Sequence, residues 1–223
     1  MLAPEIDLSL NLALGERYKS GTQKVRVISE AWAERNAFCF SCGGPLKSGR
    51  NNARVLDFTC VNCHNDFELK STRGNFSNKL PDGAFSAMMA RLSDVSSPDF
   101  FFLAYDVTSA CVTNFFAVPT YFLDPTVIER RKPLSPDARR AGWVGCNIVM
   151  HRIPEVGKVY YVRNGNILQR SAVIETEGVP FLVEQAKRLP YGRTVRSTNR
   201  VPHTERSRFM KRVVRTMNQG KVK

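Results

Sequence analysis

Two CxxC motifs constrain this chain more than any other feature of its sequence. They are Cys39-Phe-Ser-Cys42 and Cys60-Val-Asn-Cys63, with 17 residues between them. Two residues between thiolates let each pair hold one side of a tetrahedral Zn²⁺ from a tight turn, and a separation of about 15 to 20 residues is typical of zinc ribbons. The spacing therefore predicts a structural zinc site within residues 39–63. Two unrelated thiol pairs, or a redox CxxC, are the alternatives.

The remaining sequence favours a cytosolic protein. No stretch approaches the roughly 18 uninterrupted apolar residues that a membrane-spanning helix needs, and Glu5 and Asp7 stand where a signal peptide would be positively charged. Cytosolic thiols stay reduced, so we expect Cys111 and Cys146 to be small core residues rather than a disulfide. We expect a location in the bacterial cytoplasm, associated with the nucleoid.

Positive charge is concentrated in the second part of the chain. Residues 1–128 contain 12 Lys and Arg against 13 Asp and Glu, whereas residues 129–223 contain 21 against 7. Such asymmetry favours a nucleic-acid partner, although a membrane surface or an acidic protein would attract the same charge. We expect no membrane association and no small-molecule cofactor.

The apolar pattern indicates an α/β protein, with two helices and two short strands before a further helix and two apolar strands. The expected helices are 12–19, 22–36, 82–94, 181–188 and 204–218, the third opened by Pro81 and Asp82. The expected strands are 54–59, 66–70, 100–105, 112–118, 146–150 and 158–163. Residues 129–143 are basic, contain two prolines and show no regular period.

An acidic pair and a lysine lie on the two strands that flank the second CxxC motif. Alternation along a strand places Glu68 and Lys70 on one face, and hairpin pairing can bring Asp57 alongside Glu68. Carboxylate oxygens suit Mg²⁺, and a lysine can position or deprotonate the water that attacks a phosphodiester. The carbonyl oxygen of Leu69 is the expected third protein ligand of the Mg²⁺. By itself this pattern is also common on exposed strands, where it is only a solvated face.

At this point the sequence resembles the DpnI-type, or Dam-replacing, family of methyl-directed restriction endonucleases. The resemblance rests on segments that follow one another at compatible spacing before the basic tail. They are ERYKS (16–20), the two CxxC pairs, DFTC (57–60), FELKS (67–71), GNFS (74–77), DGAF with the two following methionines (82–89), RKPLSP (131–136) and RRAGWVGCNI (139–148).

The resemblance implies a PD-(D/E)XK restriction-endonuclease-like core, a mixed sheet flanked by helices, with an inserted four-cysteine zinc site. It implies cleavage of double-stranded DNA at 5′-GATC when the adenine carries an N6-methyl group. Asp57, Glu68 and Lys70 match the family's catalytic positions, and the cysteines match its zinc ligands. The implied cofactors are catalytic Mg²⁺ and structural Zn²⁺.

We expect residues 1–188 to form the nuclease domain, followed by a basic extension at 189–223. The family's prototype carries a C-terminal winged helix that also reads the methylated site, and 35 residues are too few for one. In the nuclease domain, basic side chains around residues 129–148 are expected to contact phosphates or guanine edges, and an aromatic one to stack on a base or pack in the core. These DNA-binding candidates are Arg130, Arg131, Lys132, Arg139, Arg140 and Trp143.

Two other functions remain open from the sequence. The chain can be a PD-(D/E)XK nuclease for other modified or structured DNA, because the winged helix is missing. It can also be a zinc-stabilised DNA-binding protein without catalysis, although acidic residues facing a phosphate have no purpose in a pure binder.

Overall fold

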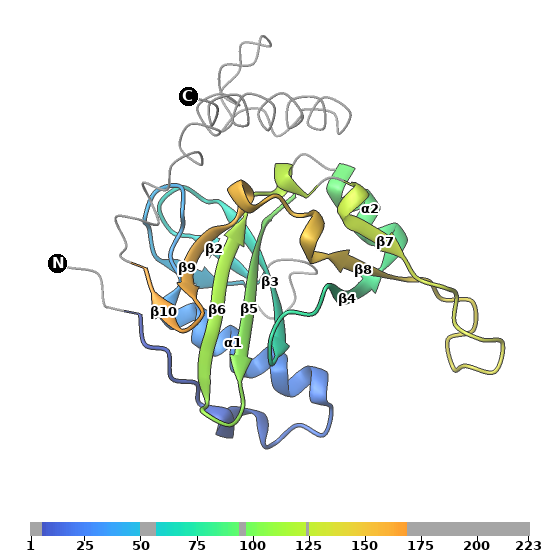
Figure 1. Ribbon diagram of the computed structural model, residues 1–223, viewed down its shortest axis with the longest axis horizontal. Helices are drawn as coiled ribbons and strands as arrows, with labels where there is room; N and C mark the ends of the chain where they lie inside the picture. The colour runs from blue at the N-terminus through green and yellow to red at the C-terminus, as the bar shows by residue number, and fades with distance from the viewer. Residues whose placement is uncertain (1–5, 50–56, 94–96, 124, 169–223) are drawn as a thin grey trace, which may run out of the picture. The chain divides into compact units, whose positions relative to one another are not determined.

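The computed structural model describes residues 6–49, 57–93, 97–123 and 125–168 (Figure 1). Within them the chain forms two compact units. The first contains the residues up to Phe76, Pro98–Val118 and the residues from Lys158 onward, and the second contains Ser77–Ser97 and Pro119–Gly157. The second unit thus comes from two insertions into the sequence of the first.

A seven-stranded mixed sheet forms the first unit, in the order β1-β2-β3-β5-β6-β9-β10. Strands β3 and β5 are parallel, and every other neighbouring pair in this sheet is antiparallel. The predicted mixed α/β architecture is therefore confirmed. The strands are β1 (Leu46–Ser48), β2 (Phe58–Cys60), β3 (Asp66–Arg73), β5 (Asp99–Asp106), β6 (Cys111–Val118), β9 (Val159–Arg163) and β10 (Asn166–Ile167).

Strand β5 is the centre of this sheet and of its core. Its residues from Phe100 to Tyr105 are all buried, as the uninterrupted apolar run predicts for a strand covered on both faces. Phe101 stacks on Phe67 of β3 with ring centroids 4.5 Å apart, and Phe102 stacks on Phe116 of β6 at 5.2 Å. Aromatic rings therefore fix the spacing of three neighbouring strands on both faces.

Helix α1 (Gly21–Asn36) lies across one face of the sheet (Figure 1). Trp32 is fully buried, meets the ring of Phe115 edge-on at 5.1 Å and donates its indole N–H to the carbonyl of Asp7 at 2.7 Å. Ser29, also fully buried, lies 2.7 Å from Ser71 of β3 between the two hydroxyl oxygens. These contacts fix α1 to β3 and β6.

The second unit contains a three-stranded antiparallel sheet in the order β4-β8-β7, together with α2 (Phe85–Ser93). The strands are β4 (Lys79–Ala84), β7 (Ile128–Arg130) and β8 (Gly145–Val149). Lys79 Nζ pairs with the carboxylate of Glu129 at 2.7 Å, and Asn147 donates to the same carboxylate at 3.1 Å, so one polar cluster joins all three strands. Four 3₁₀ turns follow in this unit: η2 (Thr120–Phe122), η3 (Pro125–Val127), η4 (Met150–Arg152) and η5 (Glu155–Gly157).

Two of the predicted helices are wrong in part. Residues Lys79–Ala84 form strand β4, and the helix begins only at Phe85, three residues after Asp82. Pro81 fits there because β4 is an edge strand, where a missing N–H costs no ladder hydrogen bond on the open side. The expected helix 12–19 is a 3₁₀ turn, η1 (Leu12–Gly15), whereas the helix expected at 22–36 is confirmed as α1.

Most of the strands expected from the sequence are present in the structure. Strands expected at 66–70, 100–105, 112–118, 146–150 and 158–163 are confirmed within a few residues. Residues 54–56 and the helices expected at 181–188 and 204–218 lie outside the described residues. Among the helices that the structure describes, none has the length and apolarity needed to cross a membrane.

Candidate active site and metal centre

The two CxxC motifs form turns of the same geometry. Cys39 accepts a hydrogen bond from the Gly43 N–H at 2.8 Å and donates its own N–H to the carbonyl of Gly44. Cys60 repeats both bonds, because it accepts from the His64 N–H at 3.0 Å and donates to Asn65. The residue after each motif has a positive φ, 69° at Gly43 and 57° at His64. Each turn therefore directs two thiols to the same side.

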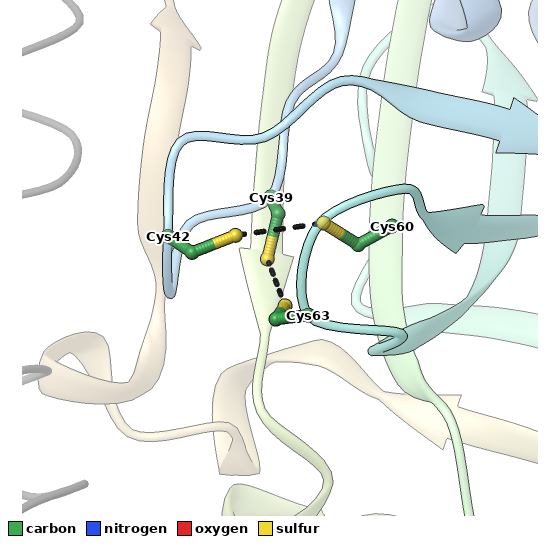
Figure 2. A group of neighbouring side chains, drawn as sticks. All are labelled: Cys39, Cys42, Cys60 and Cys63. Atoms are coloured by element: carbon green, nitrogen blue, oxygen red, sulfur yellow. Dashed lines mark hydrogen bonds between the residues drawn. The ribbon is translucent and has the colours of Figure 1, made fainter.

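The four thiols converge at one point (Figure 2). The sulfur atoms of Cys39, Cys42, Cys60 and Cys63 all lie within 4.8 Å of one another. Cys39 Sγ is 3.6 Å from Cys63 Sγ, and Cys42 Sγ is 3.5 Å from Cys60 Sγ. A tetrahedral zinc site with Zn–S bonds of about 2.3 Å has sulfur atoms about 3.8 Å apart. The cluster fits such a metal ion, as the spacing predicted.

Burial affects the thiols unequally. It raises the pKa of Cys39 far above the usual range and that of Cys63 to about 11. At Cys60 burial acts in the same direction, but hydrogen bonds from the N–H groups of Cys63 and Asn62 outweigh it, so the pKa is lowered. Cys39 and Cys63 thus keep their protons at neutral pH unless a cation compensates the thiolate charge.

Asp57 immediately precedes β2 and lies beside β3. Strands β2 and β3 are antiparallel with Phe58 opposite Phe67, so continuing the register by one residue places Asp57 opposite Glu68. The Leu69 N–H donates to Asp57 Oδ2 at 2.7 Å. The carboxylate therefore takes the place of a strand partner immediately before β2 begins.

Glu68 and Lys70 project from one face of β3 as a close pair. Lys70 Nζ donates to Glu68 Oε1 at 2.6 Å, and the two side chains are 15% and 12% exposed, respectively for Glu68 and Lys70. The ammonium lies 5.7 Å from the ring centroid of Phe100. Alternation puts Ser71, which meets α1, on the opposite face. The structure thus brings Asp57, which precedes β2, together with three consecutive residues of β3, namely Glu68, Leu69 and Lys70.

Two residues of α1 that the sequence did not indicate reach the same place. Arg26 Nη2 lies 3.7 Å from Asp57 Oδ1, and Arg26 Nε lies 2.5 Å from Glu30 Oε1. Burial raises the pKa of Glu30 more than its pairing with Arg26 lowers it, and the charge of Asp57 adds to the rise. Arg26 and Glu30 are one helical turn apart, but no local pattern shows which strand they will face.

The predicted DNA-contacting arginines and lysine lie in the second unit. Arg130 ends β7, and the loop from Arg131 to Val144 connects it to β8 (Figure 1). The loop folds back on itself, because Arg131 N–H donates to Gly145 and Leu134 N–H donates to Trp143. All the basic candidates are exposed, namely Arg130, Arg131, Lys132, Arg139 and Arg140.

Trp143 is half-buried. The side chain is therefore neither fully packed in the core nor fully exposed, the two situations that the sequence left open. One side of the ring lies against the backbone of Gly145, where an added Cβ would come within 2.8 Å of it. The Arg140 guanidinium lies 4.5 Å from the ring centroid. Gly145 and Arg140 together hold the indole at the base of the loop.

Comparison with known families identifies the chain. The family model described as DpnI, Dam-replacing family, matches residues 6–179. The chain belongs to the DpnI family. The match spans the cysteine cluster, the residues around Asp57 and the loop between β7 and β8, so the resemblance seen in the sequence is confirmed.

Membership of the DpnI family gives the general function. The protein is a nuclease of the restriction type, and its substrate is DNA. Asp57, Glu68 and Lys70 form the acidic and basic cluster described above in the first unit, which also carries a sulfur cluster that can hold a metal ion.

Proposed function

We propose that the protein is a Mg²⁺-dependent, methyl-directed type II restriction endonuclease with a PD-(D/E)XK core. It cleaves double-stranded DNA at adenine-methylated sites, 5′-G(N6-methyl-A)TC. The observation that carries the proposal is the anchoring of the Asp57 carboxylate by the Leu69 N–H, which holds it against the strand that carries the Glu68–Lys70 pair, in a member of the DpnI family.

The donor set at this site suits magnesium. Two partly buried carboxylates, Asp57 and Glu68, offer hard oxygen atoms, and the Leu69 carbonyl is the third candidate ligand. When bound there, Mg²⁺ would act as a Lewis acid toward the phosphate and lower the pKa of a coordinated water.

The protein side chains supply the other parts of the mechanism. Asp57 is fixed through Leu69 and cannot rotate away from the strand without breaking that hydrogen bond. Lys70 is held by Glu68 at 2.6 Å, so its side-chain nitrogen is positioned at that carboxylate, where it can orient the attacking water. The water oxygen forms a new bond to phosphorus as the bond between phosphorus and the 3′ or 5′ sugar oxygen breaks, and that sugar oxygen takes up a proton from solvent.

Zinc has a separate, structural role in this proposal. Cys39, Cys42, Cys60 and Cys63 bind one Zn²⁺ per chain, and the ion ties the turn before β1 to the turn between β2 and β3. Because β2 and β3 carry Asp57 and Glu68, removal of the ion disturbs the catalytic hairpin indirectly. Elemental analysis of folded protein should find one zinc per chain, and folded protein without zinc would contradict this assignment.

The division of labour follows the charge. We propose that residues 1–188 form the nuclease domain and read the site, with Arg130, Arg131, Lys132, Arg139 and Arg140 contacting the DNA and Trp143 stacking against a base. The basic extension 189–223 adds affinity that does not depend on sequence.

A plasmid cleavage assay tests the function directly. The same plasmid is prepared from adenine-methylating and non-methylating hosts and incubated with the protein and Mg²⁺, or with EDTA. We expect cleavage only of methylated DNA, only with Mg²⁺, and none by Asp57→Asn. Glu34→Gln removes a carboxylate from an exposed position of α1 and should cleave normally. Equal cleavage of both plasmids would indicate a nuclease of broader specificity, and binding without cleavage would indicate a DNA-binding protein.

A further inference from the structure

The position of α1 relative to the acidic cluster is fixed by buried contacts. Ser29 and Trp32 are fully buried, and Ser29 lies against Ser71, one residue beyond Lys70. Arg26 lies three residues before Ser29 and Glu30 one residue after it, so both are at the edge of this buried face of the helix. The rigid docking of the helix therefore holds both side chains near the start of β2, where Asp57 lies.

The cation at this edge faces solvent, whereas the carboxylates beside it do not. The Arg26 side chain is 68% exposed, that of Glu30 is 30% exposed and that of Asp57 is 17% exposed. Arg26 Nε is committed to Glu30 at 2.5 Å, which orients the planar guanidinium. Nη2 is 3.7 Å from Asp57 Oδ1, which is longer than a hydrogen bond. Nη2 is therefore directed at the site and able to donate to a ligand there.

Local charge explains why a cation is needed there. Asp57, Glu68 and Glu30 bring three carboxylates to a site that must receive a polyanion, and Lys70 Nζ is already bonded to Glu68. An arginine fixed through Nε can still present two Nη groups to a phosphate oxygen in the bidentate geometry that a lysine does not provide. An exposed, oriented guanidinium beside the candidate site thus matches a backbone phosphate.

We propose that Arg26 is a substrate-binding residue of this nuclease. It donates hydrogen bonds to a DNA backbone phosphate next to the one that is cleaved, and Glu30 is the positioning residue that orients it. The inference rests on the proposed active site at Asp57, Glu68 and Lys70. It assigns to α1 a direct part in holding the DNA strand.

Binding measurements on modified DNA test this interaction. Duplexes containing 5′-G(N6-methyl-A)TC are made with a single neutral methylphosphonate at each phosphate in turn, within the site and for three positions on either side. Affinities are measured with Ca²⁺ in place of Mg²⁺, for the wild type, Arg26→Ala and Arg26→Lys. Arg35→Ala is the matched control, because Arg35 is exposed in the last turn of the same helix.

We expect Arg26→Ala to bind the unmodified duplex about 10- to 100-fold more weakly, as for removal of a hydrogen bond to a charged group. The slope of log affinity against log salt should fall by about 0.9. One methylphosphonate should weaken the wild type and Arg35→Ala but leave Arg26→Ala unchanged, which identifies the phosphate that Arg26 binds. Arg26→Lys should retain the salt slope and recover only part of the affinity, and it replaces the alanine variant if that one does not fold.

The outcome separates this inference from the proposed function. If the wild type cleaves and Asp57→Asn does not, yet each methylphosphonate weakens Arg26→Ala as much as it weakens the wild type, Arg26 does not touch a phosphate. A fall in kcat without a change in KM or in the methylphosphonate pattern would show that Arg26 only positions Asp57, and would also overturn the inference. A wild type that binds DNA but never cleaves it refutes the proposed function instead.

Discussion

Asp57 accepts a backbone hydrogen bond with one carboxylate oxygen and lies beside Arg26 with the other, so replacing it changes the strand as well as the chemistry. Alanine and asparagine substitutions separate the two effects. Both remove the negative charge, but only asparagine keeps an oxygen that can accept from the Leu69 N–H.

We expect both Asp57→Asn and Asp57→Ala to be inactive. The alanine variant should in addition be less stable than the asparagine variant by about 1 to 2 kcal/mol in the free energy of unfolding, because the Leu69 N–H is left without that acceptor. Urea denaturation of the two variants measures the difference. Identical midpoints would show that the hydrogen bond to Leu69 contributes nothing to folding.

The cysteine cluster should make zinc affinity depend steeply on pH. The pKa of Cys63 is raised to about 11 and that of Cys39 is raised further, both by burial, so both thiols are protonated in the metal-free protein at neutral pH. Binding of zinc as thiolates then releases these protons, and affinity increases as pH rises toward these pKa values.

Competition with a coloured chelator between pH 6 and pH 8 measures this dependence. The apparent association constant should rise about tenfold per pH unit for each proton released, hence about a hundredfold per unit for two. In a Cys42→Ser variant, binding should weaken at every pH. A pH-independent affinity would mean that the thiols are already ionised before the metal binds.

At the scale of elements, the interface between α1 and β3 supports the site. Its polar centre is the hydrogen bond between Ser29 and Ser71, and Trp32 against Phe115 is the apolar packing beside it. The Ser29 hydroxyl is fully buried. Removing either hydroxyl therefore leaves the other without this hydrogen bond in a region where water does not easily replace it.

Ser29→Ala and Ser71→Ala should each lower the free energy of unfolding by about 1 kcal/mol. The loss of unfolding free energy in the double variant should be smaller than the sum of the two single losses. The difference should be at least about 0.5 kcal/mol, because the two residues contact each other directly. Thr22→Ala, on the exposed start of the same helix, is the control and should change little. Chemical denaturation of the four proteins tests this, and strict additivity would show that the hydroxyl groups do not interact.

Sequence patterns predicted the elements whose signals are local. The CxxC turns depend on four consecutive residues each, and the burial of β5 depends on its own apolar run, so both are confirmed. Strands β1, β7 and β10 contain only two or three residues, too few to show a period of two. The helix expected from Pro81 failed because pairing with β8 overrides a local start signal.

The proximity of Arg26 to Asp57 depends on tertiary packing and not on a local sequence pattern. The residues are far apart in the sequence and on different elements, and they meet only because Trp32 and Ser29 dock α1 against the sheet. Periodicity indicates that a helix has a buried face but not which strand lies under it. The grouping of Asp57, Glu68 and Lys70 on the hairpin was therefore predictable, and the approach of Arg26 and Glu30 from the helix was not.

At the scale of the whole molecule, the charge is divided along the chain. The last 21 residues, 203–223, contain seven Lys and Arg against the single acid Glu205, whereas the first 128 residues are almost neutral. A basic segment of this kind contributes electrostatic affinity for any duplex, because phosphates are the same at every sequence.

Truncation after Pro202 should therefore weaken binding to methylated and unmethylated duplexes by a similar factor, most strongly at low salt. For every phosphate that the truncated protein no longer neutralises, the slope of log affinity against log salt should fall by about 0.9. Titrations at several salt concentrations with both duplexes measure this. Disappearance of methyl discrimination with unchanged nonspecific affinity would instead assign the reading of the site to the tail.

The interleaving of the two units in the sequence has a consequence for synthesis. The chain leaves the first unit after Phe76, returns at Pro98, leaves again after Val118 and returns at Lys158. During synthesis β3 therefore emerges from the ribosome well before its parallel partner β5, and β6 emerges well before β9. The large sheet cannot form until these later segments have been synthesised. The turns that carry the four cysteines complete their own backbone hydrogen bonds within residues 39–65. We expect them to be the first part of the nascent chain to acquire a defined local structure, before the strands that complete the sheet have been synthesised.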